Sequence, residues 1–169
     1  MKRWMLCVLL ALSVMIFSSS TAPGRAASSM QLVGGGLIGS PIKGKTIDSP
    51  SDFGLAVTAD GGTFVCSMAG PLTGGFMGLK VMTVEGPVTK GSLSLHGNTA
   101  TFKGNATVVL VPGMKKEPVQ ILNDVPYTVT VGFGGPGKGW LMMRVPQFTK
   151  VLGGDTGGIM KIGSIAIGK

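Results

Sequence analysis

The protein has 169 residues, a length typical of one domain, and 44% of them are hydrophobic while 13% are charged. Glycine accounts for 29 residues, more than twice the usual share of about 7%. The hydrophobic fraction excludes a disordered chain, and two cysteines are too few for a disulfide-rich scaffold. The glycine content argues against a helical bundle, because glycine costs about 1 kcal/mol per helix position relative to alanine.

The first 26 residues predict a secretory signal peptide. Lys2 and Arg3 precede the apolar run Trp4–Phe17, and Gly24–Ala26 has the small-x-small pattern of a cleavage site. The apolar run is shorter than the roughly 20 residues needed to cross a bilayer, which disfavours a membrane anchor. We therefore expect cleavage after Ala26, no membrane span in the mature chain, and a secreted, periplasmic or cell-surface location.

Cleavage would leave 12 basic and seven acidic residues, a net charge of +5, and one thiol, Cys66. Eleven of the 12 bases are lysines that lie scattered, whereas nucleic-acid-binding proteins cluster their bases and favour arginine. We expect no nucleic-acid partner; an anionic envelope polymer or a surface protein fits the mild positive charge. Cys66 lies in an apolar run and is expected to be buried.

Residues 27–51 are rich in glycine and predict an N-terminal arm or an edge strand. Asp60–Gly62 separates two apolar runs, Phe53–Ala59 and Thr63–Ala69, which indicates a hairpin. Polar and apolar residues alternate most cleanly in Thr99–Val111, as in a strand with one solvated face. The other predicted strands are Phe76–Val84, Ser92–His96, Val119–Leu122, Val125–Phe133, Trp140–Val145 and Ile159–Ile167.

These patterns predict an all-β protein: a single antiparallel β-sandwich of about eight to nine short strands over residues 52–169. A small barrel shares the same short strands and regular turns. A membrane barrel needs aromatic girdles, and one Trp, one Tyr and six Phe beyond residue 26 are too few. The predicted core comprises Phe64, Cys66, Leu79, Val81, Leu93, Leu95, Phe102, Val108, Tyr127, Val129, Val131, Leu141, Met143, Ile159 and Ile165.

The segment Leu93–Val145 has a distinctive layout. A turn at Gly97–Asn98 precedes the pattern Ala100-x-Phe102-x-Gly104, and a later strand leads to a glycine-rich tip and an apolar strand with one basic residue. This layout resembles the Post-COAP family of β-domains in secreted bacterial surface proteins. The resemblance implies an extracytoplasmic β-sandwich without established activity. Lys138 and Trp140 depart from the Asp-containing tip of that family.

We predict a non-enzymatic protein with a structural or binding role towards surface polymers or proteins, without cofactor, metal or catalytic residues. The predicted binding residues surround the glycine-rich tip: Phe133, Lys138, Trp140 and Arg144. A Trp beside a base is typical of binding patches, and the alternative is that Trp140 points inward and fills the core. Two rival hypotheses stay open. One is a secreted hydrolase using a carboxylate pair, and the other is a periplasmic Cu(I) carrier using Cys66 and methionines.

Overall fold

The computed structural model describes residues 30–41, 48–70, 78–113, 117–152 and 155–168. The predicted signal peptide, residues 1–26, lies outside the described residues. Within these described ranges, nine strands and one short helix follow one another along the chain. They are β1 (Gln31–Pro41), β2 (Asp48–Thr58), β3 (Gly61–Ala69), β4 (Leu79–Val88), β5 (Ser94–His96), β6 (Thr99–Pro112), β7 (Gln120–Gly132), β8 (Trp140–Arg144), α1 (Pro146–Leu152) and β9 (Thr156–Gly168).

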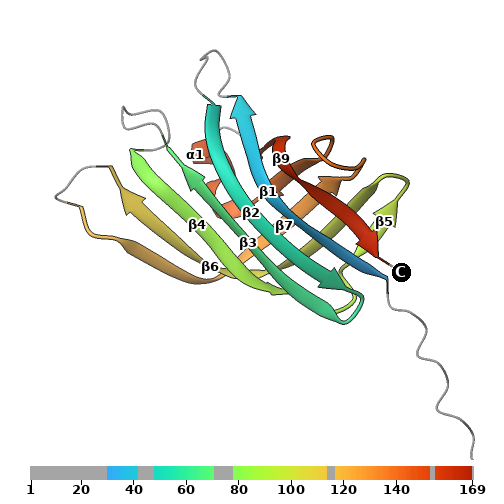
Figure 1. The fold of residues 1–169 in the computed structure, drawn as a ribbon. Helices are drawn as coiled ribbons and strands as arrows, with labels where there is room; N and C mark the ends of the chain where they lie inside the picture. Colours follow the sequence, from blue (N-terminus) through green and yellow to red (C-terminus); the bar gives the residue numbers. More distant parts are fainter. Residues whose placement is uncertain (1–29, 42–47, 71–77, 114–116, 153–154, 169) are drawn as a thin grey trace, which may run out of the picture.

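The strands form one antiparallel sheet that closes into an eight-stranded barrel (Figure 1). The sheet order is β4-β3-β2-β1-β9-β8-β7-β6, and β4 also pairs with β6, which closes the ring. The short strand β5 pairs with β6 beside this closure. The all-β antiparallel prediction is confirmed, whereas the prediction of a sandwich is wrong. Alternation and turn signals are common to both architectures, and the β4–β6 pairing that distinguishes them leaves no local signal in the sequence.

The glycine-rich segment near the N-terminus is not an edge strand. β1 pairs with β2 on one side and with β9 on the other, so it lies inside the sheet. Gly36 and Gly163 face each other in the β1–β9 register with φ values of 148° and 110°. A Cβ at either position would collide with a backbone carbonyl of the opposite strand. These glycines therefore allow two backbones to approach closely in the wall of the barrel.

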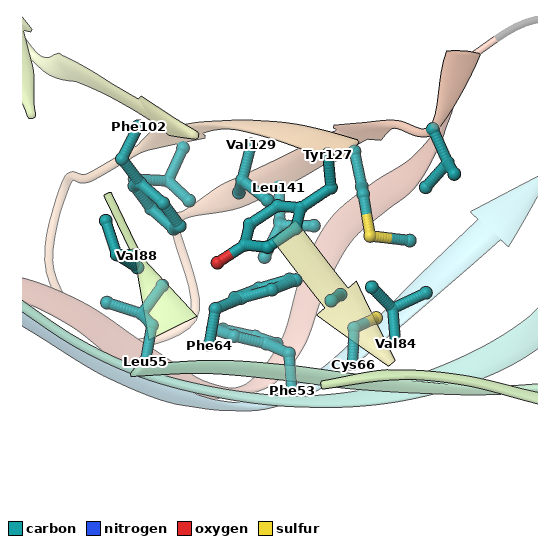
Figure 2. Packing of buried hydrophobic residues seen from close by; sticks show 14 of the residues in the cluster. Phe53, Leu55, Phe64, Cys66, Val84, Val88, Phe102, Tyr127, Val129 and Leu141 are labelled. Carbon is teal, nitrogen blue, oxygen red and sulfur yellow. The ribbon is translucent and has the colours of Figure 1, made fainter. Parts of the chain in front are cut away.

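The core fills the inside of the barrel, as expected for eight strands. Figure 2 shows the rings of Phe64, Phe102 and Tyr127 gathered there. The Phe64 ring stacks on Tyr127 with centroids 5.4 Å apart and meets Phe102 edge-on at 5.7 Å. The Tyr127 hydroxyl donates a hydrogen bond of 3.0 Å to the carbonyl of Pro87, which satisfies its buried polar atom.

Most of the predicted core is confirmed, with one clear error. Ten of the 15 predicted residues are buried, among them Cys66, and Leu79, Leu93 and Leu95 pack partly buried against them. Ile159 is instead 64% exposed on the outer wall. In β4 both faces are apolar, and the inward face proves to be that of Met82 and Val84 rather than that of Val81.

The helix α1 was not predicted from the sequence. It begins at Pro146, a favoured first helical residue, and buries Phe148 with the core. With seven residues it is too short to show a clear helical period. Across the described part of the chain, no helix is long and apolar enough to span a membrane.

Candidate functional site

Bulky side chains such as Phe64, Phe102 and Tyr127 pack together inside the described part of the barrel, where each is 2% exposed or less. The features that could bind a partner lie on the outer wall. In β8 the side chains of Leu141 and Met143 point inward, so Trp140, Met142 and Arg144 share the outer face. The alternative in which Trp140 fills the core is therefore wrong.

Trp140 lies flat on the outer wall over Gly132 of β7. The two residues are partners in the β7–β8 register, and Gly132 is buried. A Cβ at position 132 would collide with Nε1, Cε2 and Cδ1 of the indole, three adjacent atoms of its five-membered ring. Such contacts arise when the ring face, not its edge, covers the glycine. The other indole face therefore points away from the barrel, and the side chain is partly exposed.

A polar hollow of about 230 Å³ lies further along the same face of β8, beyond Trp140, at Met142 and Arg144. It is bounded by β7, β8 and Asp155, the residue before β9, and we call it the β7–β8 hollow. Its lining residues are Thr128, Thr130, Met142, Arg144 and Asp155.

Arg144 and Asp155 form a bidentate pair at this hollow. Nε of Arg144 donates to Oδ1 of Asp155 at 2.8 Å, and Nη2 donates to Oδ2 at 2.9 Å. The hydrogen bond and charge of Asp155 raise the pKa of Arg144 above its usual value. Both side chains keep exposed surface, 61% for Arg144 and 26% for Asp155. The pair thus holds planar donors and acceptors in fixed positions at the surface.

Threonine hydroxyls complete the hollow. The register places Thr130 beside Met142 and Thr128 beside Arg144. On its other side Thr130 lies opposite Thr101 of β6, and their Oγ1 atoms are 3.1 Å apart. A row of hydroxyl groups therefore runs from the hollow towards β6.

The structure brings two of the four predicted binding residues to this site. Trp140 and Arg144 share one face of β8, four residues apart, which corresponds to about 13 Å along a strand. Lys138 is exposed in the turn before β8, where its N–H donates to the carbonyl of Gly135. Phe133 packs partly buried against the core, so its ring is a structural contact more than a binding surface.

Sequence reasoning missed Thr128, Thr130 and Asp155 as site residues. The spacing of the two threonines puts them on the polar face of a predicted strand, a signal that could have placed them beside the apolar strand of Trp140. Asp155 gave no such signal, because α1 separates it from Arg144.

The rival hypotheses gain little from the geometry. Four hollows formed by described residues are each lined by at most one carboxylate, so these four offer no pair for glycoside hydrolysis. Burial raises the pKa of the Cys66 thiol to about 12, which keeps it protonated at neutral pH and disfavours a thiolate ligand. Among the described residues, no group of three or more His, Cys, Asp or Glu could hold a metal ion.

Comparisons of the chain with protein-family models, curated proteins and solved structures gave no match. The resemblance to the Post-COAP family therefore stays a prediction. What the chain does has to be argued from the site itself.

Proposed function

We propose that this protein is an exported, non-enzymatic component of the cell envelope or the secreted fraction, which binds a surface polymer or protein through its outer wall. The observation that carries the proposal is the indole of Trp140 lying over Gly132, on the same outer face of β8 as the Arg144–Asp155 pair. A preformed apolar face beside fixed polar groups is the usual composition of a binding site. The large side chains packed inside the described barrel, such as Phe64 and Phe102, also favour a binding role at the surface over a carrier role.

Export is tested by N-terminal sequencing of the protein recovered from its native host. A start near Ala27 in an extracytoplasmic fraction is expected. An intact Met1 on protein from the cytoplasm would contradict export.

Binding is tested by co-sedimentation of the purified chain with envelopes of the native host. Arg144→Met removes the cation of the site, and Lys90→Met is the matched control because Lys90 also pairs with an aspartate, Asp60, elsewhere on the surface. We expect saturable sedimentation that Arg144→Met weakens and Lys90→Met leaves unchanged. Absence of saturable binding to any envelope fraction contradicts the proposed function.

A further inference from the structure

The groups on the outer face of β7 and β8, which we call the β7–β8 wall, favour one chemical class of ligand. This inference rests on the proposed function. We infer that Trp140 and the β7–β8 hollow bind a carbohydrate chain, with one sugar ring on the indole and another ring of the same chain in the hollow. Four properties of the wall support this assignment: a flat aromatic face, a fixed array of donors and acceptors, a small hollow, and a suitable distance between them.

The indole face matches a sugar ring. A pyranose presents one face of C–H groups, whose partial positive charge suits the negative face of an aromatic ring. Trp140 already has its inner face on Gly132, so its position is fixed before a ligand arrives. Ile159, its register partner on β9, is 64% exposed and adds an apolar side chain on the opposite side of β8 from Gly132.

The ion pair matches sugar hydroxyls. A hydroxyl both donates and accepts, so it is best held where donors and acceptors lie together. Two N–H groups of Arg144 bond to Asp155 in the structure, and a guanidinium carries five. Each Asp155 oxygen also has a second lone pair. The pair can therefore donate to one hydroxyl and accept from the next without breaking its own hydrogen bonds.

The hollow has the size of one unit of a chain. Its volume of about 230 Å³ lies below the roughly 300–1,000 Å³ of pockets that enclose a whole small ligand. The separation of about 13 Å between Trp140 and Arg144 along β8 leaves room for linked rings to reach both. Thr128 and Thr130 then offer hydroxyls along the path, and Met142 offers an apolar contact.

A protein partner would use this wall differently. Protein interfaces bury a large area around a central apolar cluster. Here the exposed apolar side chains are few, Trp140, Met142 and Ile159, and they lie on the same wall as a polar hollow with a charged pair. A carbohydrate chain is therefore the ligand class that these groups favour, and a protein ligand becomes an outcome of the test.

The test uses the co-sedimentation assay with envelopes treated in two ways. Periodate cleaves the vicinal diols of sugars, and protease digestion removes envelope proteins. We expect binding to survive protease treatment and to fall at least tenfold after periodate. Binding that survives periodate but not protease overturns the carbohydrate assignment while leaving the proposed function intact. Absence of binding to untreated envelopes instead contradicts the proposed function itself.

A second measurement places the sugar on Trp140. The only other tryptophan is Trp4, so the full chain carrying Trp4→Phe reports Trp140 alone. Carbohydrate released from the protease-treated envelopes should shift the Trp140 emission to the blue and protect it from iodide. Thr130→Val should weaken this response several-fold without unfolding the barrel. An emission that does not change while the carbohydrate binds overturns the assignment of this wall.

Discussion

The β6–β7 and β1–β9 walls of the barrel are built in opposite ways. In β6 and β7 large side chains such as Phe102 and Tyr127 fill the inside, and threonines cover the outside. In β1 and β9 glycines bring the backbones together, and the outer face exposes Val33 and Ile162. Large inward side chains dominate the first wall, although Gly104 and Gly132 there also have no room for a Cβ. In the second wall the paired glycines Gly36 and Gly163 let the two backbones approach closely.

This difference shows which wall can carry polar binding groups on its outer face. A wall whose inner side chains supply the packing can carry polar groups outside at little cost, because those groups stay solvated. The hydroxyl row of Thr101 and Thr130 lies on such a wall. The described β1–β9 wall has fewer inward side chains, and its outer face exposes the apolar Val33 and Ile162 together with the polar Gln31 and Ser164.

The largest effect is expected inside the β6–β7 wall. Phe102→Ala removes a ring that is fully buried and should lower the free energy of unfolding by about 3–5 kcal/mol. Ile121→Ala, on β7 at a side chain 63% exposed, is the control and should change it by no more than about 0.5 kcal/mol. Urea unfolding of both variants measures the difference. Equal losses would mean that the barrel is not packed around Phe102.

The β1–β9 wall should lose stability when a glycine in it is replaced even by alanine. Gly163→Ala places a Cβ against the backbone of Gly35 and Gly36 at a φ of 110°, and should lower the free energy of unfolding by about 3 kcal/mol. Gly91→Ala is the control, because Gly91 has a φ of 73° but nothing within 4 Å of the added Cβ. Its cost should be about 1 kcal/mol. Similar losses in both variants would show that the close approach of β1 and β9 does not matter.

Sequence reasoning succeeded on the first wall and failed on the second for a physical reason. The alternation in Thr99–Val111 reports inward packing directly, and β6 spans Thr99–Pro112. Glycine has no side chain to alternate, so Gly34, Gly35 and Gly36 concealed a strand paired on both sides. The apolar Ile159 was assigned inward because nothing in its neighbours marks which face is solvated.

The site was predictable only where one strand carries it. Trp140 and Arg144 share the outer face of β8. They are an even number of residues apart, so the alternation of side chains along a strand already predicts that they lie on the same face. Asp155 reaches Arg144 only after a helix, and Phe133 turned out to pack on the core. Contacts between strands depend on the order of the strands in the sheet, and the local alternation of this sequence does not reveal that order.

A third prediction concerns alkaline pH and the inside of the barrel. Burial raises the pKa of Cys66 from 9.0 to about 12 and that of Tyr127 from 10.0 to about 12. The unfolded chain loses these protons first, so the stability present below pH 9 should fall between pH 9 and pH 12. The slope for each group is at most about 1.4 kcal/mol per pH unit.

Variants of Cys66 and Tyr127 test whether these two groups cause the loss of stability at alkaline pH. Cys66→Ala should flatten the fall that begins near pH 9, and Tyr127→Phe the part that begins near pH 10. Urea unfolding between about pH 7 and pH 11.5 measures the slope and covers the onset of both parts. A decline of unchanged steepness in the double variant would assign it to other groups.

The smallest expected effect on stability lies on the outer face of the β6–β7 wall. Thr130→Val keeps the β-branched shape and removes only the hydroxyl that lies 3.1 Å from Thr101, so the free energy of unfolding should change by about 0.5 kcal/mol. Thr83→Val is the matched control, because Thr83 also pairs with a hydroxyl across strands, Ser67 Oγ at 3.3 Å, far from the β7–β8 hollow. Only Thr130→Val should weaken binding to protease-treated envelopes, since its hydroxyl lines the hollow. If the two variants weaken binding equally, a general loss of wall polarity is responsible, and the hollow has no special role.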